Sequence, residues 1–268
     1  LYFLAGLILG LLAWNYSRKK AKIETTELSD QKIRLQQEKE IVVDFMHNLA
    51  VAIGEGVVRK DLYQRIAHTA VMTTGAISAC VYEKLPNGKL QSVATEGLFP
   101  PQRKIKSSLT ETSTTRARFL ENILATEVLE EGEGIIGEVA KTGKSVYVPQ
   151  ALNDPRVVKH NDPSLTLRSL IFSPLVHDDQ ISGVLVVANP ANGLTFSETD
   201  LSLVNSLAEQ AALAIKNSDA MNLRVEKTRM DSDLTLARDV QELFLAKESP
   251  YFKGLEIDTQ CYARNFAT

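Results

Sequence analysis

Cysteine is scarce in this chain of 268 residues, which has 2 thiols, Cys80 and Cys261. Thiols so far apart in the sequence are typical of a reduced cytosolic protein, and they exclude a disulfide-stapled scaffold. Histidine is scarce too: the 4 residues, at positions 47, 68, 160 and 177, share no i, i+3 or i, i+4 spacing with each other or with cysteine, so no zinc or haem site is expected. The chain also lacks an excess of positive charge, with a net charge of -3, and so has no electrostatic signature of a nucleic-acid-binding protein.

What the chain does have is an apolar run at its start, over residues 1–16 (LYFLAGLILGLLAWNY). Because roughly 20 apolar residues span a bilayer core, we expect residues 1–17 to be the inner end of a transmembrane helix whose beginning is missing. Trp14 and Tyr16 stand where an interfacial aromatic belt would lie, and the mostly basic residues 18–22 follow at once. This order predicts a single-pass protein of the inner (plasma) membrane with the bulk of the chain in the cytoplasm. A secretory signal peptide, the rival interpretation, would carry its charges before the apolar run.

Residues 18–44 are predicted to form a helical linker. Apolar residues recur every seven positions at Leu28, Leu35, Val42 and Leu49, which is the spacing of a seam between two helices. We therefore expect a parallel homodimer through the linker helices. The companion positions are polar in the first half of the linker, so a single solvated helix remains an alternative there.

Between residues 62 and 188 the chain alternates between helical and strand-like patterns. Asn87-Gly88 separates two alternating apolar runs, 77–85 and 90–95, which predicts a β-hairpin. Two further runs, joined at Asp178-Asp179, predict the central hairpin of an antiparallel sheet. The other expected elements are helices over 62–74, 116–129 and 134–142, a strand over 146–148, a turn over 153–156 and a loop over 107–115.

A second long helix is predicted to begin at Ser197, where Asp200 completes a capping box. Neither proline nor glycine interrupts the chain before Ser249, so the helix can continue as an output helix over residues 219–249. Four apolar residues there are again seven positions apart, which predicts a second dimer seam: Leu223, Met230, Ala237 and Phe244.

Several segments in the middle of the chain together resemble a GAF domain. They are residues 134–144 (GIIGEVAKTGK), 146–156 with an Asn-Asp-Pro-Arg turn, 169–185 with SLIFSPL and GVL, and 196–201 (FSETDL). The resemblance implies an α+β fold over residues 45–218, in which a six-stranded antiparallel sheet is flanked by helices. It also implies a sensor for an unknown small-molecule ligand, or a module that only dimerises.

The end of the chain resembles the start of a PP2C-type serine phosphatase domain of the kind found in bacterial sigma-factor regulators. Residues 233–245 (DLTLARDVQELFL) match the first helix of that domain, and Pro250 with residues 254–257 (GLEI) matches the strand that follows. The domain over residues 250–268 would then be truncated before the Gly-Gly-Asp segment that supplies its metal-binding carboxylates. The resemblance implies that the parent protein uses manganese or magnesium to dephosphorylate a phosphoprotein, whereas this fragment contains no catalytic residue, metal ligand or cofactor.

The candidate ligand-binding residues are the polar side chains expected between the sheet and residues 134–168, namely Tyr82, Tyr147, Arg156, Arg168 and Ser173. Each has a plain alternative as a loop or surface residue. Cys80, on the first strand, is expected in the core.

One motif resembles a different kind of site. Thr142-Gly143-Lys144-Ser145 looks like the end of a phosphate-binding P-loop. However, Glu138 stands where that motif needs a glycine, and a helix precedes the motif where a strand is required. We therefore interpret Gly143 as the C-cap of a helix.

Together these patterns predict a membrane-anchored signalling protein. Its GAF sensor would respond to a ligand or partner and regulate the C-terminal phosphatase through the output helix, because differential affinity for two arrangements shifts the balance between them. The first alternative is a non-enzymatic GAF module that dimerises or binds a metabolite. The second is a sensor kinase or a cyclase; a kinase would carry a histidine in the output helix, and residues 218–247 contain none.

Overall fold

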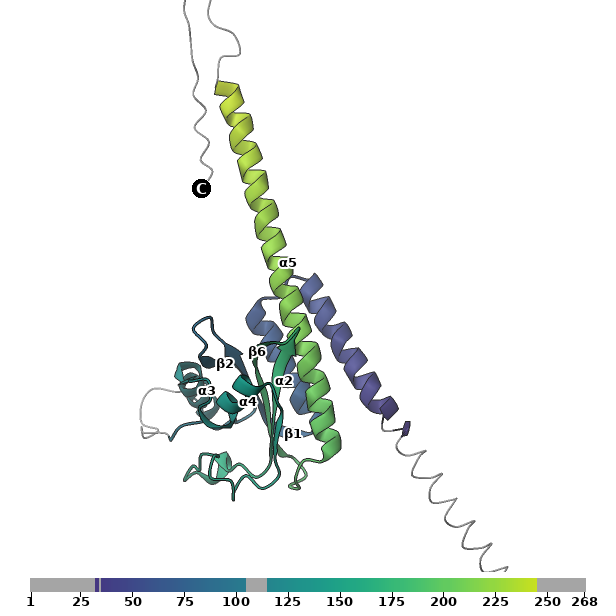
Figure 1. Ribbon diagram of the computed structural model, residues 1–268, viewed down its shortest axis with the longest axis vertical. Helices are drawn as coiled ribbons and strands as arrows, with labels where there is room; N and C mark the ends of the chain where they lie inside the picture. Colours follow the sequence, from purple (N-terminus) through teal and green to yellow (C-terminus); the bar gives the residue numbers. More distant parts are fainter. Residues whose placement is uncertain (1–31, 34, 105–114, 245–268) are drawn as a thin grey trace, which may run out of the picture. The chain divides into compact units, whose positions relative to one another are not determined.

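The computed structural model describes residues 32–33, 35–104 and 115–244, and Figure 1 shows the elements that they form. By its contacts the chain divides into two compact units, one that ends at Ser218 and one that begins at Asp219, and each is described by itself. The first is an α+β domain, as predicted. The second is, within the described residues, the C-terminal part of one helix.

The first unit is built on a six-stranded sheet with the order β3-β2-β1-β6-β5-β4. Every neighbouring pair is antiparallel, which confirms the predicted sheet. The strands are β1 (Ala76–Lys84), β2 (Leu90–Glu96), β3 (Val128–Leu129), β4 (Val146–Val148), β5 (Leu170–His177) and β6 (Gln180–Pro190).

Both predicted hairpins are present. Strands β5 and β6 are joined at Asp178 and Asp179, whose φ angles of 48° and 59° are both left-handed, as in a type I′ turn. Strands β1 and β2 are joined through Gly88, with a φ of 82°. The left-handed backbone at these turns matches the twist of the strands that they connect.

One face of the sheet is covered by a helical layer. The layer contains the helix of residues 35–54, α2 (Arg59–Thr74) and the first part of α5 (Glu198–Phe244). The helix of residues 35–54 lies beside α5 (Figure 1), and the hydroxyl of Ser202 donates a hydrogen bond of 2.9 Å to Glu38. At the start of α5, the Asp200 carboxylate accepts hydrogen bonds from the hydroxyl and the backbone N–H of Ser197, and the Ser197 hydroxyl accepts one from the backbone N–H of Asp200. These bonds confirm the predicted capping box.

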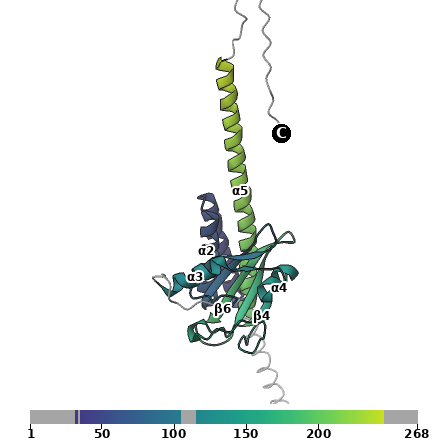
Figure 2. The same ribbon diagram turned by 90° about the vertical axis from the view of Figure 1, so that its left-hand side faces the viewer.

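The opposite face of the sheet is covered by α3 (Arg116–Thr126) and α4 (Gly134–Thr142); the short 3₁₀ helix η1 (Pro163–Leu165) lies in the segment that leads to β5. Figure 2 looks onto this side, with α3 and α4 in front of the strands. A second apolar core fills the space beneath them. We call this the α3/α4 side, and the other face the α2/α5 side.

Helix α4 depends on two glycines. A Cβ at Gly137 would lie 2.5 Å from the carbonyl oxygen of Glu130 and 2.7 Å from the backbone nitrogen of Gly132, so only glycine lets α4 pack against this loop. Gly143 ends the helix with a φ of 67°, and its N–H bonds the carbonyl of Val139. The interpretation of Gly143 as a C-cap is therefore confirmed.

One predicted helix ends early. The pattern predicted a helix over residues 116–129, but α3 stops at Thr126, and Val128 and Leu129 pair with Gln91 and Leu90 as strand β3. Apolar residues at the end of a helical pattern cannot be distinguished from a short strand by periodicity alone.

Part of the apolar repeat in the N-terminal linker packs against helices of the same chain. Leu49 is 2% exposed and packs, with Phe45 and Ala52, into the core shared with α2 and α5, whereas Leu35 is 66% exposed. The same spacing that predicted contact with a second copy is thus satisfied, at Leu49, by helices of the same chain.

Several predictions fall on residues outside the described ranges. They are the transmembrane segment of residues 1–17, the linker over 18–31, most of the loop over 107–115, the end of the output helix, and the domain over 250–268 with the strand matched to residues 254–257. Among the residues that the structure does describe, none belongs to a helix with the length and hydrophobicity needed to span a bilayer.

Candidate functional site

Strand β1 divides its side chains between the two cores, because successive residues of a strand point to opposite faces. Ala79 and Val81 belong to the core on the α2/α5 side, whereas Cys80 and Tyr82 belong to the core on the α3/α4 side. The pairing of β1 with β2 shifts register between Val81 and Tyr82. Polar atoms therefore enter the α3/α4 side from the middle of the sheet.

Tyr82 is the most unusual of these residues. Its side chain is 0% exposed, and within the described residues its hydroxyl makes no hydrogen bond of normal geometry, although the Cys80 thiol lies close enough to contribute to its raised pKa. Burial raises the pKa of Tyr82 well above its ordinary value, so the phenol stays protonated and keeps a proton to donate. An unsatisfied buried hydroxyl costs about 1–3 kcal/mol, and this one lies in the same core as Phe99 and Leu124.

Cys80 and Ser92 form a hydrogen-bonded pair beside it, with 3.3 Å between Sγ and Oγ across strands β1 and β2. Burial raises the pKa of Cys80 to about 12, so the group is a thiol at neutral pH. A buried thiol in this state is neither a nucleophile nor a metal ligand. The prediction that Cys80 belongs to the core is confirmed.

Glu127, between α3 and β3, adds a carboxylate to this group. It is 7% exposed and accepts a hydrogen bond of 3.0 Å from the backbone N–H of Gln102. Burial raises the pKa of Glu127, against the effect of the backbone N–H groups that it accepts from. Its charge in turn contributes to the raised pKa values of Cys80 and Tyr82. We call Cys80, Tyr82, Ser92 and Glu127 the polar cluster.

Of the five residues predicted to bind a ligand, only Tyr82 lies in the polar cluster. Tyr147 and Ser173 point to the α2/α5 side, where each ties a strand to the segment or helix that covers it. The Tyr147 hydroxyl donates to the carbonyl of Phe196, and the Ser173 hydroxyl donates to Asn205 at 2.8 Å. Ser145 donates to the same amide oxygen of Asn205 at 2.6 Å. Both predicted residues therefore have structural contacts of their own.

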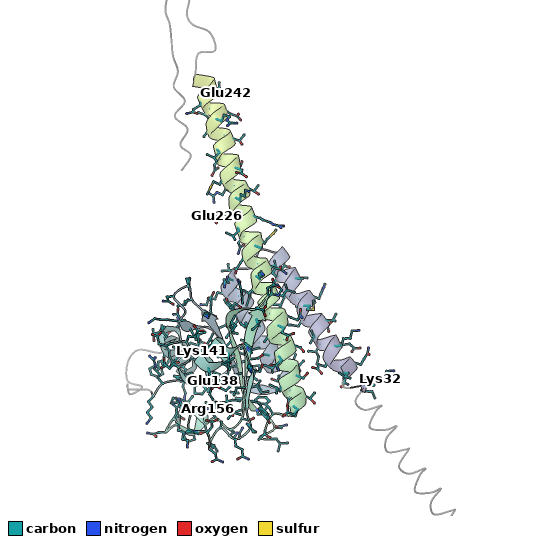
Figure 3. All side chains as sticks on the ribbon, viewed as in Figure 1. Lys32, Glu138, Lys141, Arg156, Glu226 and Glu242 are labelled. Atoms are coloured by element: carbon teal, nitrogen blue, oxygen red, sulfur yellow. The ribbon has the colours of Figure 1, made fainter. Side chains whose placement is uncertain are left out.

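Arg156 is occupied by carboxylates at the outer end of α4. Its guanidinium pairs with Asp154 at 2.8 Å and with Glu138 at 3.0 Å; Figure 3 labels Arg156 and Glu138 in the same part of the domain. The hydrogen bond with Arg156 lowers the pKa of Asp154. Arg156 and Tyr147 share a shallow pocket of about 500 Å³.

Arg168 lies elsewhere, at the start of β5. Its side chain is exposed and lines a pocket of about 380 Å³ with Thr166 and Asn189. Its backbone N–H is held by the side chain of Asn189 at 2.7 Å. The five predicted residues are thus spread over separate places, and their role in ligand binding stays a prediction.

No metal centre is apparent in the described ranges. There, no group of three or more His, Cys, Asp or Glu side chains is arranged to hold an ion. What the polar cluster offers instead is one phenol donor, one buried carboxylate and a thiol–hydroxyl pair, a set suited to hydrogen bonding rather than to covalent chemistry.

Sequence reasoning missed Ser92 and Glu127. Ser92 on β2 pairs with Tyr82 on β1. This register could have been inferred from the Asn87-Gly88 hairpin, which joins the two strands. The sequence did not indicate that Glu127 is buried, because the residue follows a helical pattern in which an exposed acidic side chain is common.

A family model for the GAF domain matches residues 59–216, more than half of the chain. Among solved structures, the GAF domain of an Acinetobacter phosphoenolpyruvate-protein phosphotransferase is 19% identical with a TM-score of 0.50, over 66% of this chain and 94% of that one. The corresponding domain from Coxiella burnetii is 15% identical with a TM-score of 0.50, over 68% and 96%.

Another similar structure is free methionine-R-sulfoxide reductase from Neisseria meningitidis, solved in complex with its substrate. It is 16% identical with a TM-score of 0.50, over 68% of this chain and 90% of that one. At such identities the likeness shows the fold alone.

Proposed function

Because the chain belongs to the GAF domain family, we propose that it is the sensor part of a membrane-anchored signalling protein and that it binds its ligand on the α3/α4 side of the sheet. The observation that carries this proposal is the hydroxyl of Tyr82, which is fully buried and has no partner within the described residues. Buried polar groups are nearly always hydrogen-bonded, so each exception calls for an explanation. A ligand atom that accepts the phenol proton would supply one.

The polar cluster also limits the chemistry of the ligand. The proton of Tyr82 needs an acceptor, while Glu127 is a carboxylate whose charge is already disfavoured by burial. A second anion nearby would be repelled in this low-dielectric space. The ligand is therefore a compact neutral or cationic molecule that carries a carbonyl, ether or ring-nitrogen acceptor.

The test uses a pair of tyrosines on opposite faces of the sheet. The chain is purified from its expression host and melted in the presence of each member of a panel of neutral and cationic metabolites. A compound that binds the folded chain should raise its melting temperature. In Tyr82→Phe this rise in melting temperature should disappear. Tyr147→Phe should keep it, because the hydroxyl that it removes donates to the carbonyl of Phe196 on the α2/α5 side. A compound that stabilises Tyr82→Phe as well as the original chain would refute the assignment.

For the output we propose a PP2C-type phosphatase that begins near residue 250. Support comes from the resemblance of residues 233–245 and 254–257 to the start of such domains, and from α5, which continues without a break from Glu198 to Phe244. In that family a two-metal site with manganese or magnesium activates the water that hydrolyses the phosphoester. The reading frame beyond Thr268 should encode a Gly-Gly-Asp segment, and a different sequence there would exclude this output.

The chain of 268 residues should itself release no phosphate from a phosphopeptide in the presence of manganese, because the carboxylates that bind the metals would lie downstream. Measurable turnover would contradict the proposal. Fractionation of cells that express the chain should place it with the inner membrane, held by residues 1–17.

A further inference from the structure

The C-terminal part of α5, residues 219–244, carries an apolar stripe that nothing in the described residues covers. Leu223, Met230 and Leu234 are 66%, 59% and 65% exposed. The stripe follows positions alternately three and four residues apart, and five of its seven members are apolar: Ala220, Leu223, Lys227, Met230, Leu234, Ala237 and Gln241.

This spacing selects the kind of surface that can cover the stripe. Alternating steps of three and four average 3.5 residues per turn, so the stripe stays on one face only if the helix winds around another helix. A second sheet or a flat surface would follow the stripe for no more than a few turns. The complementary surface is therefore a long helix with the same repeat.

We infer that this helix is the same segment of a second copy, aligned parallel and in register. The charges beside the stripe carry the argument. On one side the flanking residues are Asp219, Glu226, Asp233 and Val240, of which the first three are acidic. On the other side they are Arg224, Asp231 and Arg238.

In a parallel pair, each residue of the first side faces the residue five positions later on the second copy. Asp233 then meets Arg238 of the second copy, and Asp219 meets Arg224. In an antiparallel pair the acidic sides would face each other, and Arg224 would face Arg238 of the second copy. Opposite charges across the seam therefore favour the parallel arrangement, while like charges oppose the antiparallel one.

The middle of the seam explains its register. There Glu226 faces Asp231 of the second copy, a like-charge pair, and Lys227 lies in the seam next to both. The long side chain of Lys227 can bring its ammonium group between these two carboxylates. Polar residues inside such a seam allow one register and disfavour shifted ones, at some cost in stability.

This inference concerns residues 219–244 alone and depends neither on the ligand nor on the phosphatase. It also assigns the two linkers different roles. Leu49 of the N-terminal seam is buried against helices of its own chain, whereas the seam of α5 is exposed and can contact a second copy.

Cross-linking tests the arrangement in the full chain, solubilised in detergent and carrying Cys261→Ser. Cys80 is fully buried and stays in place. Ala237→Cys puts a thiol in the seam, and Ser232→Cys puts one on the opposite face of the same helix. A short bismaleimide should join copies at position 237 in at least about tenfold higher yield than at position 232. Equal yields at the two positions, or none at 237, would overturn the inference.

Charge reversal then tests the register. Asp233→Arg and Arg238→Asp, each added to the Ala237→Cys chain, should lower the cross-linking yield severalfold, because each creates a like-charge pair. The double variant restores opposite charges and should recover the yield. If the double variant cross-links as poorly as the single ones, the parallel in-register pairing is wrong. Circular dichroism of each variant confirms that the helix itself is retained.

Discussion

Tyr82 places a hydroxyl in an apolar core without a hydrogen-bond partner in the described part of the chain. Phenylalanine would fill the same volume without the desolvation cost, so packing alone gives no reason for the hydroxyl. Tyr147 provides the comparison, because its hydroxyl is bonded to Phe196. The two tyrosines should therefore respond in opposite directions to the loss of one oxygen atom.

We predict that Tyr82→Phe raises the free energy of unfolding of the ligand-free chain by about 1 kcal/mol, since an unsatisfied buried polar group is removed. Tyr147→Phe should lower it by about 1 kcal/mol, the typical net value of a hydrogen bond. Urea unfolding followed by circular dichroism measures both. A loss of stability in Tyr82→Phe would mean that its hydroxyl has a partner after all.

A second prediction concerns Glu127, whose pKa is raised in the fold by burial. The folded state then binds the proton more tightly than the unfolded state, so this residue makes stability fall as the pH rises from the ordinary carboxyl range through the raised value. Glu127→Gln keeps an oxygen for the N–H of Gln102 but cannot ionise. It should be more stable than the original chain at neutral pH, with the difference shrinking toward about pH 5.

Urea unfolding of both proteins across this pH range decides the point, because the difference between the two curves isolates the one group. Asp154 is a useful contrast, since its pKa is lowered by Arg156. Asp154→Asn should change stability in the opposite sense, losing stability at neutral pH relative to acid. Parallel curves for Glu127→Gln and the original chain would contradict the prediction.

Among the elements, α4 shows most clearly how one residue type permits a fold. The helix packs against the loop before it only because Gly137 has no side chain, as the 2.5 Å approach to the carbonyl of Glu130 shows. Gly54, at the end of the helix of residues 35–54, has no atom within 4 Å of the position a Cβ would take. The same substitution should therefore destabilise the fold at Gly137 but not at Gly54.

Gly137→Ala should lower the free energy of unfolding by about 2 kcal/mol or more, because backbone atoms must move to admit the methyl group. Gly54→Ala should leave it unchanged or raise it by up to about 1 kcal/mol, because alanine restricts the unfolded chain. Thermal unfolding compares the two. If Gly137→Ala proved as stable as Gly54→Ala, the loop would have to be more adaptable than its packing indicates.

Much of the fold was predictable from local patterns. The hairpin at Asn87-Gly88, the capping box at Ser197 and the C-cap at Gly143 each depend on a few neighbouring residues, and all three are present. Patterns whose meaning depends on distant residues were less informative. The repeat at Leu49 could not reveal whether its partner helix belonged to the same chain, and Val128 could not be separated from the helix before it.

The candidate site was predictable only in part, for a similar reason. Tyr82 was found because it is a polar aromatic on an alternating strand. Tyr147 lies on the other face, because the flanking Val146 and Val148 pack in the α3/α4 core, and the alternation Val-Tyr-Val alone does not say which face meets which core. The burial of Glu127 depends on how the chain leaves α3, which no local pattern specifies.

For the whole molecule, the division at Ser218 separates a domain with two cores from a second unit whose described residues, 219–244, belong to neither core. The core residues that cover the two faces of the domain's sheet all come before that point, the last of them being Ile215 in the first part of α5. Its stability should therefore come from residues up to 218, and removal of the later residues should leave its interior unaffected.

We predict that a chain ending at Ser218 keeps the amide hydrogen-exchange protection of β1 and β6 found in the longer chain, with opening free energies changed by no more than about 0.5 kcal/mol. The same chain should also retain any ligand response that Tyr82→Phe abolishes. Loss of protection in these strands would mean that the residues after 218 help to hold the domain together.

Strand β1 has a mechanical consequence. Val81 and Tyr82 are joined by one peptide bond, yet one side chain contacts the helices and the other contacts the opposite core, and the pairing with β2 slips between them. Because the two side chains share one stretch of backbone, a displacement of β1 at this slip in the pairing would carry both of them. A ligand that displaced Tyr82 would then also shift Val81 against the helices on the α2/α5 side.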